Sequence, residues 1–366
     1  AACYVSWAFA RAFDAATMAP HVHGLAQSLL VLVAFDREVN VRRAASAAFQ
    51  ENVGRQGSFP HGIDIVTRTD YFAVSVRANA YLELATFLAG YDEYRQPLLE
   101  HLLHSKSRHW DEAVRQLAAR SARLLAPMAR EWAEGVLLPE LCKRTLSPDL
   151  KERHGSALML AEVALGLCGG ADATPHTLPP ELRKQLSGVV PAVEKARLYR
   201  GRGGEVMRGA SCRVLEATAT IRLPCGPKAA LRTLASIDES IKHPSEAISL
   251  AAVGALRAVT EAYYTQRRER TSGGDADGTA PETSGPPLAD GEPLVARYAK
   301  PLLIDPNAGL RRGYALALGA LPAAQLKLDL PRAVEALIEA STLEADAERH
   351  DPETRRNALA SLPAIA

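Results

Sequence analysis

A short unit recurs along this 366-residue chain: an aspartate in a turn precedes an alanine-rich helix that carries an arginine in its first two turns. In four successive units the arginines are Arg42, Arg77, Arg115 and Arg153, at gaps of 35, 38 and 38 residues. These gaps approach the period of about 40 to 47 residues that is typical of HEAT and armadillo repeats. The unit therefore predicts an all-α, HEAT/armadillo-like α-solenoid of stacked antiparallel helix pairs.

Apolar periodicity supports this prediction within single units. From Val41 to Val53 the apolar residues recur at i, i+3, i+4, i+7, i+8 and i+12, which places them on one face of a helix. We therefore expect Arg42 and Arg43 to face outward. In this interpretation each aspartate caps a helix and each arginine pairs along a ladder between neighbouring units, with direct partner contact as the alternative. Aromatic residues make up only 5% of the chain, and no alternating β-branched run predicts a strand.

Two segments interrupt the helical pattern before residue 270, and a third follows it. We expect HEAT-type repeats over residues 1–270, with an irregular inter-helix loop at 54–71 and a break at 169–180. Residues 271–293 contain no basic residue and are rich in Gly, Pro and acids, which predicts a disordered surface insertion. Residues 294–366 continue the repeats. Because the helical pattern runs to both chain ends, we expect a truncated piece of a longer protein.

Charge and cysteine usage narrow the classes of partner. Lys and Arg total 43 against 42 acidic residues, so no large net field favours nucleic acid, which we do not expect as a partner. The five cysteines form no C-x-x-C pair and are odd in number, which indicates a reducing cytosol. No unbroken run of about 18 apolar residues is present, so we do not expect membrane insertion.

Motifs for catalysis, cofactors and metals are weak. The glycines at 201–204 fail the spacing of a phosphate-binding loop, and a helix-joining turn explains them better. His101 and His104 lie one helical turn apart, but without H-E-x-x-H or a nearby carboxylate they are read as surface residues. Nucleophile signatures such as G-x-S-x-G are missing from the sequence. We therefore predict no catalytic residue, no cofactor and no metal site, and no enzyme.

Several specific strings resemble the tubulin-folding cofactor D family, also called tubulin-specific chaperone D. They include Arg42 to Gly57 (RRAASAAFQENVGRQG), Phe59 to Ile65 (FPHGIDI), Asp70 to Val74 (DYFAV), His109-Trp110-Asp111, Leu146 to Leu150 with Arg153-His154-Gly155, and Leu316 to Pro322 (LALGALP). The resemblance is strongest in the first 210 residues and thins between Cys212 and Pro301.

The resemblance implies a cytosolic, microtubule-cytoskeleton-associated chaperone that is not an enzyme. Such a protein captures β-tubulin, works with tubulin-folding cofactors C and E and an Arf-like small GTPase, assembles or disassembles the αβ heterodimer, and stimulates GTP hydrolysis by its partner. A curved repeat surface suits a large client. The alternative is a structural HEAT scaffold or transport-type adaptor with no tubulin role.

The residues we expect to contact a partner are those predicted to be exposed, or to lie in an irregular loop, within the most family-like string. They are Gln50, Glu51, Asn52 and Arg55 on the helix, and His61, Asp64, Asp70 and Tyr71 in the following loop. The competing interpretation is that this loop folds back onto its own repeats.

Overall fold

The computed structural model describes residues 1–169, 177–201, 203–265, 293–342 and 351–365. Within these ranges the chain is helical and contains no strand, which confirms the predicted all-α repeat class. The chain divides into two compact units: unit 1 comprises Ala1–Leu167 and Leu178–Gln185, and unit 2 comprises Cys168–Thr177 and Leu186–Ala366. Each unit is described by itself below.

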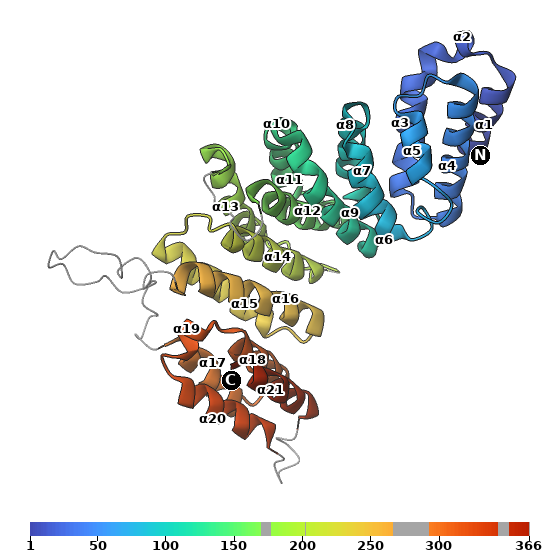
Figure 1. Cartoon of the computed structure of the whole chain (residues 1–366). Helices are drawn as coiled ribbons and strands as arrows, with labels where there is room; N and C mark the ends of the chain where they lie inside the picture. Colours follow the sequence, from blue (N-terminus) through green and yellow to red (C-terminus); the bar gives the residue numbers. More distant parts are fainter. Residues whose placement is uncertain (170–176, 202, 266–292, 343–350, 366) are drawn as a thin grey trace, which may run out of the picture. The chain divides into compact units, whose positions relative to one another are not determined.

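The first unit is built from helices of very different length (Figure 1). Several of them are continued by π-helical turns. Such turns lie at Ala80–Leu84, Leu102–Lys106 and Ala133–Leu137. The helices are α1 (Ala2–Ala12), α2 (Ala15–Met18), α3 (Val22–Phe35), α4 (Val39–Gln56), α5 (Gly62–Arg68), α6 (Arg77–Asn79), α7 (Ala85–Ala89), α8 (Asp92–His101), α9 (Glu112–Leu125), α10 (Arg130–Trp132), α11 (Leu138–Arg144) and α12 (Leu150–Cys168).

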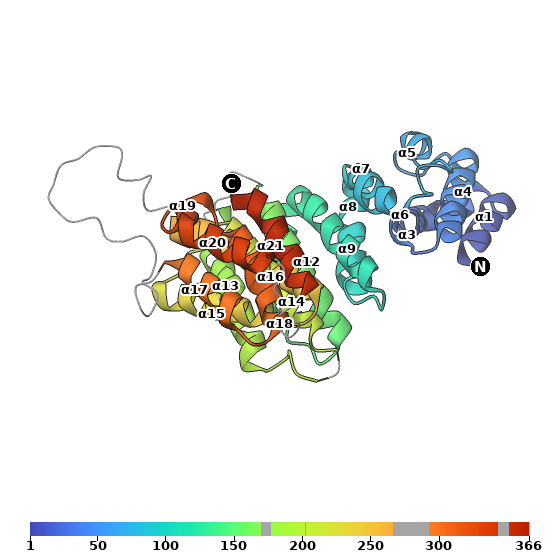
Figure 2. The same cartoon turned by 90° about the horizontal axis from the view of Figure 1, so that it is seen from below.

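The helices that follow are α13 (Pro180–Lys195), α14 (Val206–Thr220), α15 (Pro227–Ile241), α16 (Glu246–Thr260), α17 (Leu294–Ile304), α18 (Ala308–Ala320), α19 (Ala323–Leu326), α20 (Leu330–Ser341) and α21 (Pro352–Ile365). In unit 2, consecutive helices such as α15 and α16, α17 and α18, and α20 and α21 pack as pairs (Figures 1 and 2). One apolar core containing Leu234, Leu256, Tyr298 and Leu318 runs through these pairs.

Hydrogen bonds between neighbouring repeats reproduce the sequence period. In unit 1 the hydroxyl of Ser121 donates to the Tyr81 carbonyl, 40 residues earlier. In unit 2 the Tyr263 hydroxyl donates to Leu223 O, also 40 residues earlier, and Ser361 donates to Ala315 O, 46 residues earlier. The recurring spacing in the sequence is therefore a recurring contact in the structure.

The predicted capping by aspartates is confirmed at α9, whereas Glu38 and Asn307 are the N-caps of α4 and α18. The arginines do contact neighbouring repeats, but the prediction that Arg42 faces outward is wrong. Asp111 caps α9 by accepting from the amide of Ala113 at 3.0 Å. Arg42, however, is only 1% exposed, and it donates to four carbonyls: Val74 O (2.7 Å), Ser75 O (2.8 Å), Asp36 O (2.9 Å) and Arg37 O (3.0 Å). The turn before the helix leaves carbonyls without donors, and a buried guanidinium satisfies them.

We call this arrangement, in which a helical arginine donates to carbonyls of the preceding turn, the arginine clamp. It recurs in later repeats. The Nη1 atom of Arg115 donates to the carbonyls six and five residues before it, and that of Arg153 does likewise; Arg311 donates to the carbonyl six residues before it. Backbone carbonyls, rather than the carboxylates of a neighbouring repeat, are thus the principal partners of Arg42, Arg115 and Arg153, whereas Arg77 does not form this contact among the described residues.

The irregular loop predicted at 54–71 is also corrected. Helix α4 continues to Gln56, and α5 (Gly62–Arg68) lies inside the segment, so only its connections are irregular. Gly57 ends α4 in the left-handed region at φ 62°. Gly62 begins α5. A Cβ atom there would lie 2.7 Å from the Val53 side chain of α4, so a glycine at this position allows the two helices to pack closely.

Two other segments that the sequence singled out fall largely outside the described residues. These are most of the break at 169–180 and nearly all of the insertion at 271–293.

One helical stretch, Ala15–Phe35, is long and apolar enough to cross a membrane by length and composition alone, with a mean hydropathy of 1.4. Its residues Leu29, Leu30, Val33 and Phe35 are buried, and α3 packs against α4 and α8. This packing is that of a core helix in unit 1.

Candidate partner-binding surface

The four candidates on α4 are placed differently from one another. Gln50 is exposed, and Arg55 is exposed and ion-paired with Glu51. Glu51 also lies 3.7 Å from Arg11 of α1, and the hydrogen bond from Arg55 holds the pKa of its carboxyl below the usual value. This pair is a short charged ridge beside α1.

The prediction of Asn52 as an exposed contact is wrong, because its side chain is fully buried. Its amide donates to Ala48 O at 2.8 Å and, at 3.4 Å, to Ser6 O of α1. Asn52 lies three residues after Phe49 and four after Ala48, so it belongs to the apolar face of α4, and its polar side chain satisfies backbone carbonyls there.

His61 lies in the turn before α5, at a positive φ of 53°. Its ring stacks on Tyr91 with centroids 4.2 Å apart, and its Nε2 lies 3.4 Å from the Glu93 carboxylate. Asp64 is exposed on the first turn of α5. His61 therefore ties the turn to the start of α8, as the fold-back interpretation expects.

Asp70 and Tyr71 occupy the turn after α5. The Oδ1 atom of Asp70 accepts from the amides of Phe72 (2.9 Å) and Ala73 (2.7 Å), which makes Asp70 a turn-forming residue. The turn presents Tyr71 outward, with the Arg43 guanidinium 3.7 Å from the centre of its ring. Tyr71 and Arg43 form a cation–π pair at the surface.

The candidates predicted from the sequence did not include the exposed apolar residues of this surface. Ile63 is 76% exposed and Phe72 is 78% exposed, and the Phe72 ring lies edge-on to Tyr71. Exposed apolar side chains of this size are the ones that partners bury. The available signal was the pair of aromatics directly after a turn-forming aspartate.

The structure joins some of the predicted residues and separates others. It pairs Glu51 with Arg55, whereas His61 contacts Tyr91 and Glu93, and Tyr71 contacts Arg43 and Phe72. We use the name apolar cluster of unit 1 for three exposed side chains: Ile63 on α5, and Tyr71 and Phe72, which contact each other in the turn after it.

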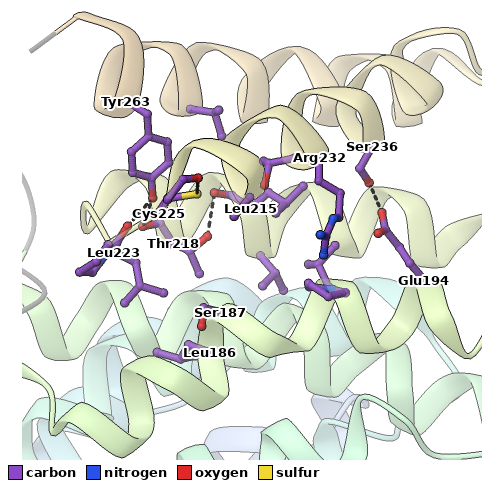
Figure 3. A pocket seen from close by; sticks show the side chains of 18 residues that line it. Leu186, Ser187, Glu194, Leu215, Thr218, Leu223, Cys225, Arg232, Ser236 and Tyr263 are labelled. Atoms are coloured by element: carbon purple, nitrogen blue, oxygen red, sulfur yellow. Dashed lines mark hydrogen bonds between the residues drawn. The ribbon is translucent and has the colours of Figure 1, made fainter. Parts of the chain in front are cut away.

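A separate, mostly apolar cavity of about 300 Å³ lies in unit 2 (Figure 3). Its walls come from α13, α14, α15 and the turn after α14, and they include Leu186, Val190, Leu215 and Leu223. This volume is at the lower end of the range for small-molecule sites.

Several polar groups around this cavity are engaged with one another or with the backbone. The Ser236 hydroxyl donates to the Glu194 carboxylate, and the Tyr263 hydroxyl donates to Leu223 O at 2.7 Å (Figure 3). Burial raises the pKa of the Cys225 thiol, so the thiol stays protonated, unlike an activated nucleophile. Among the described residues, no group of three or more His, Cys, Asp or Glu side chains could hold a metal ion.

Comparison with known proteins agrees with the family resemblance. Residues 1–63 match the family model described as Tubulin-specific chaperone D-like, ARM repeats. The chain is 30% identical over 253 residues to Tubulin-specific chaperone D of Dictyostelium discoideum, a match that covers 68% of this chain and 16% of that protein. It is 35% identical over 126 residues to Tubulin-folding cofactor D of Schizosaccharomyces pombe, covering 34% of this chain and 11% of that protein.

The chain thus spans a small part of the length of these relatives. Among solved structures, a designed armadillo repeat protein covers 73% of this chain and all of its own, at 14% identity and a TM-score of 0.35. An engineered protein of solved structure covers 99% of this chain and 94% of its own, at 17% identity and a TM-score of 0.31. The predicted resemblance to the tubulin-folding cofactor D family is confirmed by the family model and the two relatives.

Proposed function

Starting from its similarity to tubulin-specific chaperone D, we propose that this chain is a cytoplasmic tubulin-chaperone segment that binds β-tubulin. It acts with tubulin-folding cofactors C and E and an Arf-like small GTPase on the αβ heterodimer. The observation that carries the proposal is the alignment of 253 residues at 30% identity. Stimulated GTP hydrolysis and association with microtubules belong to the same proposal, with the nucleotide held by the partner.

The apolar cluster of unit 1 supports this proposal physically. Its three members, Ile63, Tyr71 and Phe72, are each more than half exposed on a rigid scaffold of helices. Burying such side chains against a partner gives about 25 cal/mol for each Å² of apolar surface removed from water. Exposed Gln50 and Arg55 on α4 and Asp64 on α5 supply polar groups on two helices that pack together, as the rim of an interface requires.

A pull-down from cytosol tests this function. The purified chain is immobilised, and retained β-tubulin, cofactors C and E, and the Arf-like GTPase are detected by blotting. We expect retention of β-tubulin above the level of an acidic control protein. Retention of neither tubulin nor any of these factors by a folded chain would contradict the proposal and favour the adaptor alternative.

A matched pair of variants locates the contact. Ile63→Ser with Phe72→Ser removes two exposed apolar groups from unit 1, and Leu250→Ser with Ile304→Ser removes two from unit 2. We expect the first pair to weaken tubulin binding about tenfold or more, as for interface anchors, and the second to change it little. Equal effects would argue against the apolar cluster as the contact.

A further inference from the structure

A polar cleft of about 570 Å³ lies in unit 1, away from the apolar cluster's own side chains. Three chain segments border it: residues Arg37 to Arg42 at the start of α4, the segment from Ser75 to Ala78, and α9 from Ala113 to Arg120. Successive repeats therefore contribute to one cleft.

The charged residues that line this cleft are mostly basic. Arg37, Arg42, Arg77 and Arg120 line it, and Glu38 is the one acidic lining residue. The amino-terminal ends of α4 and α9 also border it, and their backbone dipoles add to the positive potential.

Nearby carboxylates neutralise only one of the four arginines. Arg37 lies 3.4 Å from Glu38 and 3.3 Å from Asp111, so both acids are directed to the same guanidinium. Arg42 is satisfied by four backbone carbonyls, which carry no net charge. Arg42 therefore keeps an uncompensated charge, and two of the four guanidinium groups remain without a partner among the described residues.

Those two cations are Arg77 and Arg120, whose guanidinium groups make no hydrogen bond or ion pair within the described residues. The Nε atom of Arg77 is buried and has no acceptor. Burial lowers the pKa of Arg42, and the charge of Arg77 lowers it further, so the positive charges in the cleft repel one another. An unpaired buried donor costs free energy that a bound acceptor restores.

We propose that this cleft binds an acidic peptide segment of a partner protein, with carboxylates on Arg77 and Arg120. Guanidinium groups bind carboxylates in a bidentate geometry, with charge-assisted hydrogen bonds. The lining also includes the aliphatic side chains of Val39, Ala78 and Leu117, which suit the methylene stems of glutamate. This inference does not depend on the proposed function, because any partner with an exposed acidic segment can supply the ligand.

Fluorescence anisotropy of a labelled glutamate-rich peptide tests this assignment with the full chain. Arg77→Gln with Arg120→Gln removes the two unpaired cations. Arg68→Gln with Arg257→Gln removes two exposed arginines that do not line the cleft, so net charge falls equally. We expect the first pair to weaken binding about tenfold or more and the second less than about twofold.

Charge reversal gives a second readout that general destabilisation does not produce. Arg77→Glu with Arg120→Glu should abolish binding of the glutamate peptide and create binding of a lysine-rich peptide of equal length. Trp110, which stacks on Arg37 at 4.6 Å and is exposed, reports occupancy by its fluorescence when Trp7 and Trp132 are replaced by phenylalanine.

Three results would overturn the assignment. These are equal losses in the cleft and control pairs, tighter binding of a phosphopeptide than of a glutamate peptide of the same net charge, and no binding of the glutamate peptide by the folded chain at low salt, where charge attraction is strongest.

Discussion

The Nε atom of Arg115 donates a hydrogen bond to Nδ1 of His154 over 3.1 Å, joining α9 to α12 across 39 residues. The histidine is only 3% exposed, and burial, followed by the charge of Arg115, lowers its pKa to about 4. The contact requires neutral imidazole, because a protonated Nδ1 would be a second donor facing a cation.

Acid should therefore destabilise unit 1 through His154. The folded pKa lies below the unfolded value of about 6.5, so the folded state binds fewer protons. Stability is present above pH 6.5 and falls as the pH drops from 6.5 to 4, by about 2 kcal/mol at pH 5. Urea unfolding at pH 7 and pH 5 measures this difference.

Two variants make the assignment specific. His154→Gln keeps a hydrogen-bond acceptor without titrating, so it should reduce the pH dependence, whereas exposed His23→Gln should leave it intact. An unchanged pH dependence in His154→Gln would show that other groups cause the acid effect.

Arg42→Lys should destabilise the fold although it conserves charge. Lysine cannot reproduce the planar fork that reaches carbonyls on both sides of the clamp, so buried acceptors lose donors. We expect a loss of about 2 to 4 kcal/mol by chemical denaturation. Arg43→Lys at the half-buried neighbouring position should change stability by less than about 0.5 kcal/mol, and equal effects would contradict the clamp.

Gly155→Ala tests the close approach of α12 to the segment after α8. A Cβ atom at Gly155 would lie 1.7 Å from the Ser107 carbonyl oxygen, so the backbones must separate. We expect a loss above about 3 kcal/mol or failure to fold. Gly54→Ala in α4 meets nothing within 4 Å and should be neutral or stabilise by up to about 1 kcal/mol.

In unit 2, Asp238 holds α15 to α17. It accepts from Arg297 Nε at 2.8 Å and from the Tyr298 hydroxyl at 2.9 Å, and it is 7% exposed. Asp238→Asn leaves the guanidinium without its counter-charge, so we expect a loss of about 3 to 5 kcal/mol. Glu246→Gln removes an exposed ion pair with Arg356 and should cost less than about 1 kcal/mol. Similar losses in thermal unfolding would contradict this account.

The fold class was predictable because the Asp-to-Arg unit encodes a local structure, a capped turn whose carbonyls face a helical arginine. The burial of Arg42 was not, since an arginine in an amphipathic pattern is normally exposed, and its acceptors at Val74 and Ser75 lie in the next repeat. Helix α5 was hidden by the glycines before and at its start, of which Gly57 ends α4 at a positive φ and Gly62 serves close packing.

Of the candidate contacts, most proved to be exposed, while Asn52 is a buried donor to α1. The polar cleft could not be found from sequence spacing. Arg77 and Arg120 lie in different repeats, while Glu38 and Asp111 both pair with Arg37. Which cations remain unpaired is a property of tertiary structure.

Tubulin binding is the function that we propose for this segment. Its most direct test is a titration of the purified chain with αβ-tubulin heterodimer, at physiological salt, against an unrelated protein of similar acidity. The account predicts saturable binding to tubulin alone, weakened by Ile63→Ser with Phe72→Ser. Absence of saturable binding by a folded chain, or equal binding of the acidic control protein, would contradict it.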